Sequence, residues 1–237
     1  MQNLAGRLGS LLVSIATALL ILAITMPLFL NPAWVGFEQG RAEATAWTGY
    51  GEGDLRAATN AILADLVLGP PEFDVAVGGR PVLAERERAH MRDVRGVFLA
   101  FFALTGVLVV AALAAALFAR RHSTASLGVW RAVRRGALGL IAGLVVAGAV
   151  SFVAFDSLFD VFHRLFFPGG SYTFDPTTDR LVQLFPFAFW QETAIALGIV
   201  SIVIAAVIAL VAGRAAYDSR QPRRQVTATM PAQGSAE

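Results

Sequence analysis

Four long stretches of apolar residues constrain this chain more than any other feature of its sequence. They run over residues 8–30, 97–119, 136–155 and 193–212. A helix rises about 1.5 Å per residue, so 20 residues reach roughly 30 Å, the thickness of the hydrocarbon layer of a membrane. The stretches therefore predict a membrane α-helical protein with a bundle of four spanning helices. The first stretch is longer than the roughly 7–15 apolar residues of a secretion signal, so we expect it to remain as an anchor.

The distribution of arginine predicts the orientation of these helices. The chain has no lysine, so all 19 basic residues are arginine. The N-terminus, residues 120–135 and the tail from Gly213 carry 10 arginines and 2 acids, whereas residues 31–96 and 156–192 carry 9 arginines and 15 acids. Cytoplasmic loops of membrane proteins are enriched in positive charge. We therefore expect both termini in the cytoplasm and both acidic segments on the outer side of a multi-pass protein.

These two patterns together predict the organisation of the whole chain. The segments are a cytoplasmic N-terminus with the first span (1–30), the first part of an extracytoplasmic cap (31–96), the second and third spans with an arginine-rich cytoplasmic loop (97–155), the second part of the cap (156–192), the fourth span (193–212) and a disordered cytoplasmic tail (213–237).

Local signals in the two acidic segments predict a small α+β cap. Asp54 is placed to cap a helix that ends at Gly69-Pro70, and Gly78-Gly79 can form the turn of a short hairpin. Residues 84–95 contain no helix breaker and lead directly into the second apolar stretch, so this helix should extend about three turns beyond the lipid. Asp175-Pro176 is typical of the start of another short helix.

Small residues four apart on the third apolar stretch suggest how that helix packs. Gly139, Gly143 and Ala147 form such a stripe, and Ala205 and Ala209 form another on the fourth stretch. Helices in lipid associate by close backbone approach, which small side chains permit. We expect both stripes to lie in contacts between helices.

The composition excludes several kinds of chemistry. The chain has no cysteine, which rules out disulfides, a cysteine nucleophile and thiolate metal sites, and the absence of lysine rules out Schiff-base chemistry. The formal net charge is only +2, so no footprint for nucleic acid is expected. No segment contains the His-Glu-x-x-His spacing of a zinc site, and we predict neither a metal nor another cofactor.

Two of the three histidines occupy similar predicted depths at the outer ends of the second and third helices. His90 and Asp93 are three residues apart, so they share one helix face, and Asp156, Asp160 and His163 do the same at spacings of four and three. Five phenylalanines recur beside them at helical spacing. They are Phe152, Phe155, Phe159, Phe162 and Phe166.

This grouping of imidazoles, carboxylates and aromatic rings is suited to acyl transfer. Histidine can accept and donate protons near neutral pH, and a neighbouring carboxylate can orient the ring. Two histidines facing one cavity could take a proton from an attacking amine and return one to a leaving alkoxide. Two alternatives stay open: a metal-assisted ester hydrolase that uses the same side chains, and a non-enzymatic protein that binds lipids or a partner through its aromatic face.

Two stretches also resemble the signatures of a known family. Glu85 to Val94 resembles a glutamate followed by His-Met-x-Asp-Val, and Phe155 to His163 resembles Phe-Asp-x-x-Phe-x-x-Phe-His. Further on come Phe-Asp-Pro at 174–176 and Phe-Pro at 185–186. These motifs resemble those of the lipoprotein intramolecular transacylase family, whose members are bacterial four-helix membrane proteins.

The resemblance implies an activity, a substrate and a location. Members of this family move an acyl chain from the glyceryl sn-2 oxygen of a diacylglyceryl lipoprotein to the α-amine of its N-terminal cysteine, which gives the lyso form. By the resemblance, His90 and His163 carry the reaction at an extracytoplasmic site of the bacterial cell membrane. The expected partners are the diacylglyceryl lipoprotein and membrane lipids, and no covalent enzyme intermediate is needed.

Our working assignment makes His163 the base, oriented by Asp156 or Asp160, and His90 the acid, supported by Asp93; the two roles can be exchanged. The chain departs from the family pattern at residues 168–172, where Tyr172 could line the aromatic pocket, and at Phe187, where an acid is frequent.

Overall fold

A computed structural model describes residues 4–119, 125–167 and 169–219. The elements in chain order are α1 (Leu4–Thr25), the 3-10 turn η1 (Met26–Leu28), α2 (Pro32–Arg41), α3 (Ala44–Thr48), α4 (Glu52–Val67), β1 (Ala76–Val77), β2 (Arg80–Pro81), α5 (Glu85–Ala119), α6 (Ala125–Phe166), α7 (Arg180–Leu184) and α8 (Phe187–Asp218). Arg120, Arg121 and residues 220–237 of the predicted tail lie outside the described residues. The prediction of a disordered tail from Gly213 is wrong for residues 213–218, which continue α8.

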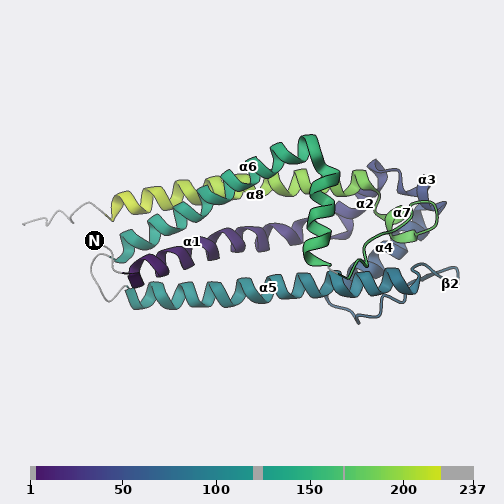
Figure 1. Cartoon of the computed structure of the whole chain (residues 1–237), viewed down its shortest axis with the longest axis horizontal. Coiled ribbons are helices and arrows are strands. Elements are labelled where there is room, and N and C mark those ends of the chain that lie inside the picture. The colour runs from purple at the N-terminus through teal and green to yellow at the C-terminus, as the bar shows by residue number, and fades with distance from the viewer. Residues whose placement is uncertain (1–3, 120–124, 168, 220–237) are drawn as a thin grey trace, which may run out of the picture.

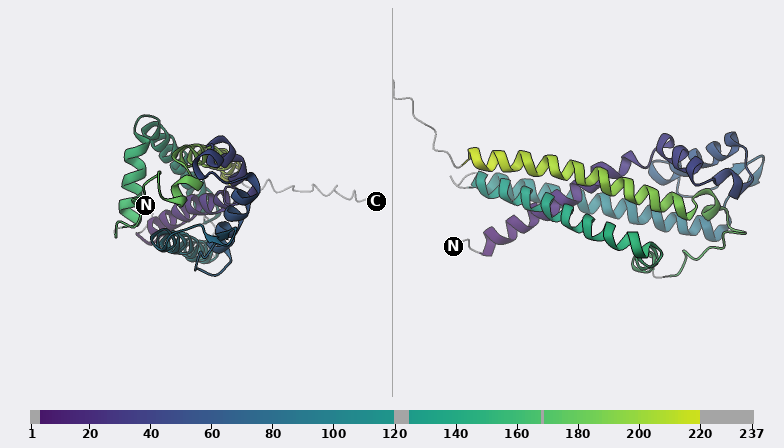
Figure 2. Two further views of the ribbon diagram at one scale, coloured as in Figure 1. Left: turned by 90° about the vertical axis from the view of Figure 1, so that its right-hand side faces the viewer. Right: turned by 90° about the horizontal axis from the view of Figure 1, so that it is seen from above.

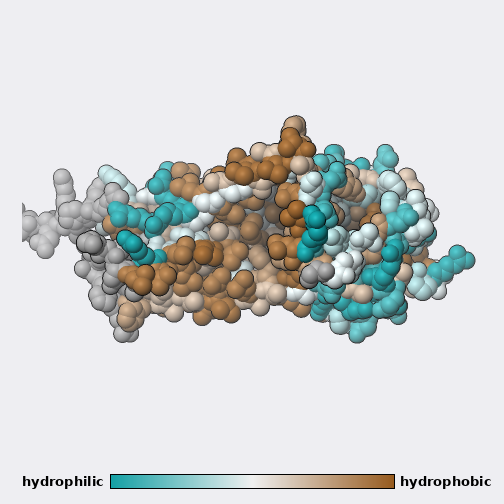
Figure 3. Space-filling model, in the orientation of Figure 1, coloured by the Kyte–Doolittle hydropathy of each residue, from teal (hydrophilic) through white to brown (hydrophobic). Residues whose placement is uncertain are grey.

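Four helices, α1, α5, α6 and α8, are long and apolar enough to cross a membrane, which confirms the predicted spans. They run lengthwise through the molecule and form the bundle in Figure 1. Their surface carries a broad apolar belt between two more polar ends (Figure 3). Both ends of the described chain lie at one end of the bundle and the cap lies at the other (Figure 1). Helix α8 extends to Asp218, six residues past the predicted end of the fourth span at 212.

Helix α6 packs mainly against α8 and α1, while α5 packs mainly against α1. Ala205 and Ala209 are buried in these contacts, as their spacing predicted. The stripe predicted on α6 is wrong, because Gly139 and Gly143 are exposed. The backbones of α6 and α1 instead come close together at Gly136, where an added Cβ would overlap the carbonyl oxygen of Ser14 on α1.

The cap consists of α2, α3, α4, α7 and the hairpin β1–β2, gathered around their own apolar core (Figure 2). The hairpin is antiparallel, with Val77 opposite Arg80, and both turn glycines have positive φ, which confirms that prediction. The helix predicted to start at Asp54 begins earlier, at Glu52, so Asp54 belongs to its first turn and does not cap it.

Two short helices, α2 and α3, have no counterpart in the sequence prediction, although α2 carried a readable signal. Asn31 caps it by accepting hydrogen bonds from the backbone nitrogens of Ala33 at 3.0 Å and Trp34 at 3.1 Å, and Pro32 is its first residue. Conversely, Asp175-Pro176 forms a turn, in which the nitrogens of Thr178 and Asp179 donate to the Asp175 carbonyl oxygen, and the helix begins only at Arg180.

The end of α6 does not continue the line of its span. Ala154 has φ −149° and ψ 42°, values outside the helical region, and the chain bends there. The last part of α6 then crosses toward α5 beneath the cap (Figure 1). This bend brings the segment that carries His163 next to the cap end of α5.

Candidate active site

The two histidines predicted from sequence face each other where the cap meets the bundle. His90 lies in the second turn of α5 and His163 one turn before the end of α6. Their ring centroids are 6.1 Å apart, and the planes are nearly parallel at 23°. His90 is buried, with 5% of its surface exposed. Because removal from water disfavours a charged ring, the site favours a neutral imidazole at His90.

Aromatic side chains surround the pair. Three of the predicted residues contact His163 directly: Phe159 at 4.0 Å, Phe162 at 5.4 Å and Tyr172 at 5.1 Å between ring centroids. Phe155 and Phe166 lie one ring further away, against Phe159 and Phe162 respectively. Few water molecules can therefore reach the two imidazoles from this side.

Two rings of this wall were not predicted from the sequence. Phe167 lies 4.8 Å from His90 and 5.6 Å from His163, so it contacts both imidazoles. Phe174 packs edge-on against His90 at 5.4 Å. Phe174 belongs to the Phe-Asp-Pro motif, which was the signal that could have identified it. Phe167 lay just beyond the predicted helical stripe and gave no separate signal.

The hydrogen bond that orients His163 comes from the backbone. Its Nδ1 lies 2.8 Å from the carbonyl oxygen of Phe159. A carbonyl oxygen only accepts, so Nδ1 carries the proton and donates it, and the lone pair is on Nε2. Asp160 had been predicted as a possible partner. Its carboxylate pairs instead with Arg164 at 2.9 Å and accepts a hydrogen bond from the Tyr172 hydroxyl at 3.4 Å.

The other predicted carboxylates are not hydrogen-bonded to the histidines either. Asp156 is exposed on the first turn after the bend. Asp93 accepts a hydrogen bond from Ser171 at 3.0 Å, while the buried Nδ1 of His90 has no hydrogen-bond partner among the described residues. No group of three His, Cys, Asp or Glu in the described part of the chain is placed to hold a metal ion.

Glu87 and its neighbour Arg86 attach the beginning of α5 to the second part of the cap. Neither residue was predicted from the sequence to have this role. Glu87 is 1% exposed, and its two oxygens accept hydrogen bonds from the backbone nitrogens of Ala84 and Leu181, each at 2.6 Å. Arg86 pairs with Asp179 and lies over the Phe174 ring. This guanidinium lowers the pKa of Asp179 below its usual range.

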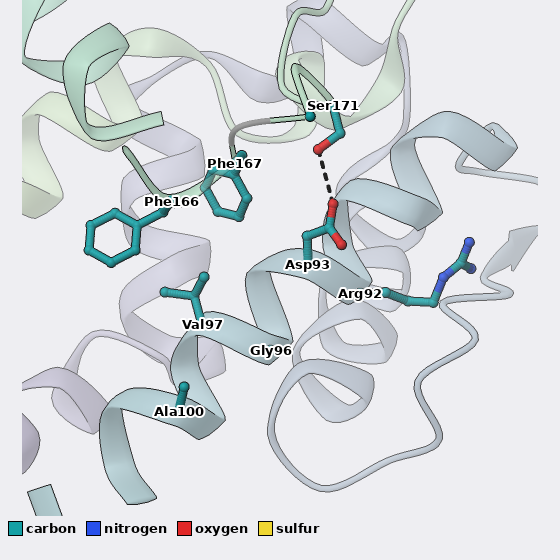
Figure 4. Close-up of a pocket in the computed structure, with 9 residues that line it drawn as sticks. Arg92, Asp93, Gly96, Val97, Ala100, Phe166, Phe167 and Ser171 are labelled. Carbon is teal, nitrogen blue, oxygen red and sulfur yellow. Dashed lines mark hydrogen bonds between the residues drawn. The ribbon is translucent and has the colours of Figure 1, made fainter. Parts of the chain in front are cut away.

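A cavity of about 480 Å³ opens between α5 and the end of α6, next to the histidines. Figure 4 shows its two ends. The Asp93 carboxylate and the Ser171 hydroxyl meet at one end, and Val97, Ala100 and Phe166 lie toward the other. Phe167 forms the wall that the cavity shares with the two imidazoles.

At two positions where the sequence departs from the family motifs, the structure shows what the present residues contact. Phe187 packs edge-on against Phe155 at 5.1 Å and lies 6.4 Å from Phe159, so it extends the aromatic wall. Tyr172 places its ring beside His163, and its neighbour Ser171 bonds to Asp93.

Comparisons with known proteins agree on one family. A family model described as "Lipoprotein intramolecular transacylase Lit" matches residues 10–190, which is most of the chain. The solved structure of the membrane-integral lipoprotein intramolecular transacylase from Bacillus cereus is similar in fold, with a TM-score of 0.74 at 17% identity, covering 92% of this chain and 99% of that one. A variant of that protein with a histidine replaced by arginine gives a TM-score of 0.68 at 18% identity, with 91% and 93% covered.

One curated relative matches over part of its length. An uncharacterized protein of Aquifex aeolicus is 25% identical over 123 residues, which are 52% of this chain. The match spans about half of that relative, 53% of its length.

Proposed function

Because the chain belongs to the lipoprotein intramolecular transacylase family, we propose that it is a membrane acyltransferase acting on diacylglyceryl lipoproteins. It moves the acyl chain from the glyceryl sn-2 oxygen to the α-amine of the N-terminal cysteine of the same lipoprotein. One observation carries the proposal: two imidazoles from distant parts of the chain stack 6.1 Å apart in an aromatic enclosure at the edge of the bundle.

The reaction needs no other reactant. The amine nitrogen attacks the carbonyl carbon of the sn-2 ester, and a carbon–nitrogen bond forms. The bond between that carbon and the glyceryl oxygen then breaks, leaving an amide and a free hydroxyl. One proton leaves the amine and one joins the glyceryl oxygen, so a base and an acid suffice.

The hydrogen bonds support one assignment of these roles. His163 holds its proton on Nδ1 against the Phe159 carbonyl, so its Nε2 is free to take the proton of the amine. The proton that His163 has taken is relayed to the His90 ring stacked beside it and passes from there to the leaving glyceryl oxygen, so both imidazoles are neutral again after the reaction. Asp93 and Asp160 act through the local potential and through Ser171 and Tyr172, because neither is bonded to an imidazole. Asp156, which is exposed, adds a further negative charge.

The aromatic enclosure supplies orientation. Amine and ester belong to one flexible molecule, and holding them in a reactive pose can lower the barrier by about 7–11 kcal/mol in the best intramolecular cases. Phe155, Phe159, Phe162, Phe166 and Tyr172 are the predicted residues of this enclosure.

Mass spectrometry of a diacylated lipopeptide tests the proposal. Incubation with the purified protein should leave the total mass unchanged and place one acyl chain on the cysteine nitrogen. H90A and H163A should each lose this product by about 100-fold or more, the contribution usual for acid–base catalysis. H122A, which changes the only other histidine, serves as the matched control and should retain activity. A folded wild type that leaves its native lipoprotein unchanged would refute the proposal.

The same assay separates the two alternatives. A chelator should have no effect on the transacylase but should inhibit a metal-assisted hydrolase, which would also release free fatty acid. A protein that only binds lipid should keep its cellular function in H90A and H163A and lose it in F159A.

We further propose that the cap and both histidines lie on the outer side of the cytoplasmic membrane, with both termini in the cytoplasm. The arginine excess at the end of the bundle opposite the cap supports this orientation.

A further inference from the structure

The cavity between α5 and the end of α6 changes character along its length. Its outer rim is polar, formed by Arg92, Asp93 and Ser171. Its deeper part is apolar, formed by Val97, Ala100 and Phe166, and Gly96 lies between the two. A site with a polar mouth and an apolar floor matches an amphipathic ligand that has one polar end and a hydrocarbon chain.

The cavity lies next to the proposed catalytic pair, on the other side of the Phe167 ring. Phe167 lines it and also contacts both His90 and His163. An ester group at the imidazoles can therefore extend its chain past Phe167 into the apolar part. Asp93 is three residues from His90 on the same helix, and it lies at the polar rim of the cavity.

The apolar part faces the surroundings of the bundle. Ala100 and Phe166 are exposed, and Leu104 and Val107, further down α5, are also exposed. Helix α5 rests mainly on α1, so this flank of it is not covered by α6. A long chain could leave the cavity along α5 and remain in the hydrocarbon layer.

We infer that this cavity binds the acyl chain that is transferred, and that Gly96 and Ala100 determine which chains fit. The inference rests on the proposed function. A hydrocarbon chain is the occupant because the floor offers only apolar contacts, and because the Phe167 ring, which lines the cavity, also contacts both imidazoles. Because Gly96 has no side chain, the cavity is wide enough there for the first part of the acyl chain. Ala100 lies one turn and about 6 Å deeper, and its small side chain leaves room for the rest of the chain.

Two glycines on α5 make a matched pair for the test. An added Cβ at Gly96 would meet nothing within 4 Å, and the same holds at Gly106. Both are exposed helical residues, but only Gly96 lines the cavity. G96L and G106L therefore introduce the same side chain into the same helix, and only the first one narrows the cavity.

The experiment compares lipopeptides with a butyryl or a palmitoyl group at sn-2, using kcat/KM for acyl transfer measured by mass spectrometry. G96L should lower kcat/KM for both chains, and A100L should lower the palmitoyl-to-butyryl ratio about tenfold, the loss usual when a pocket excludes a methylene-sized group. G106L should match the wild type with both substrates.

The outcomes separate the two proposals. A wild type without transfer activity would refute the proposed function itself. An active wild type whose A100L variant keeps the wild-type ratio would overturn only the acyl-chain site. An equal loss with both chains in A100L would overturn it as well, because a residue deeper in the cavity should spare the short chain.

Discussion

Glu87 joins the two halves of the cap through the backbone nitrogens of Ala84 and Leu181, one from each half. The carboxylate satisfies amides at the beginnings of α5 and α7, where helices leave unpaired N–H groups. His90 follows one turn later on the same helix, and Arg86 holds Phe174 against the His90 ring from the other side. Glu87 thus acts on the site through the placement of His90, as a positioning residue.

We predict that E87Q destabilises the protein and slows the reaction. An amide oxygen can still accept one of the two N–H groups, but the amide nitrogen cannot accept the other, which costs about 1–3 kcal/mol in a buried site. A displaced His90 should lower kcat with little change in KM, which single-turnover and steady-state kinetics can separate. E85Q is the control, because Glu85 is exposed and pairs with Arg88 and Arg92. Equal effects of the two variants would contradict the prediction.

Glu38 leads to a prediction about pH. It is buried in α2, and burial, followed by the nearby Glu192, raises the pKa of its carboxyl group. A raised pKa means that the folded state binds more protons than the unfolded state, so stability falls as pH rises from the ordinary glutamate value through the folded one. E38Q should therefore gain stability over the wild type at pH 8 by about 1 kcal/mol, roughly 2–4 °C in Tm.

The advantage of E38Q should shrink at pH 5, where Glu38 in the wild type is closer to its protonated form. Thermal unfolding in detergent at both pH values measures this difference. A constant offset between E38Q and the wild type at both pH values would contradict the explanation.

At the scale of elements, α6 decides where the site forms. Gly139 and Gly143 of the predicted small-residue stripe are exposed, whereas Gly136, which was not part of that stripe, faces α1. Ser14 of α1 reinforces that contact by donating a hydrogen bond to the Ala132 carbonyl oxygen at 2.9 Å. The bend at Ala154 then turns the end of α6 toward α5, where the His163 ring lies 6.1 Å from that of His90.

We predict that G136A destabilises the bundle and G139A does not. A Cβ at position 136 would overlap the Ser14 carbonyl oxygen, so α1 and α6 would have to move apart, at a cost of about 1–3 kcal/mol for overpacking. A Cβ at position 139 meets nothing within 4 Å. Thermal stability of the purified variants in detergent provides the measurement. A Tm for G136A equal to that of G139A would show that the contact is not close.

For the whole molecule, the separation of charge along the bundle suggests its orientation. The apolar belt in Figure 3 lies between the cap and the end that holds Leu4 and Ser219. The absence of cysteine makes this orientation testable, because any introduced thiol is unique in the chain.

We predict that T178C in the cap reacts with a membrane-impermeant thiol reagent added to intact cells, and that S219C at the end of α8 does not. Both positions are exposed in the structure, so the difference depends on the side of the membrane. After the cells are opened, both variants should be labelled, which controls for reactivity. Labelling of S219C alone in intact cells would reverse the orientation.

The sequence by itself determined the features that depend on local composition and on the spacing of residues along a helix. Four apolar stretches long enough for a membrane predicted the spans, and helical spacing placed His90 and His163 at the outer ends of two of them. The hairpin at Gly78-Gly79 followed from turn chemistry. Each of these properties is decided by residues close together in the chain, so a pattern of a few positions carries the information.

Only the tertiary structure decided which groups touch. The stacking of His90 on His163 and the burial of Glu87 between two helix ends depend on segments far apart in sequence. The bend at Ala154 and the bond from His163 to the Phe159 carbonyl are local, but no sequence pattern indicated them. Carboxylates three or four residues from a histidine share its helix face, but Asp93 and Asp160 bond to other partners. Asp93 accepts a hydrogen bond from Ser171 in a distant loop, and Asp160 pairs with Arg164 on the exposed side of α6. Spacing along one helix specifies a face, whereas packing between helices specifies the contact.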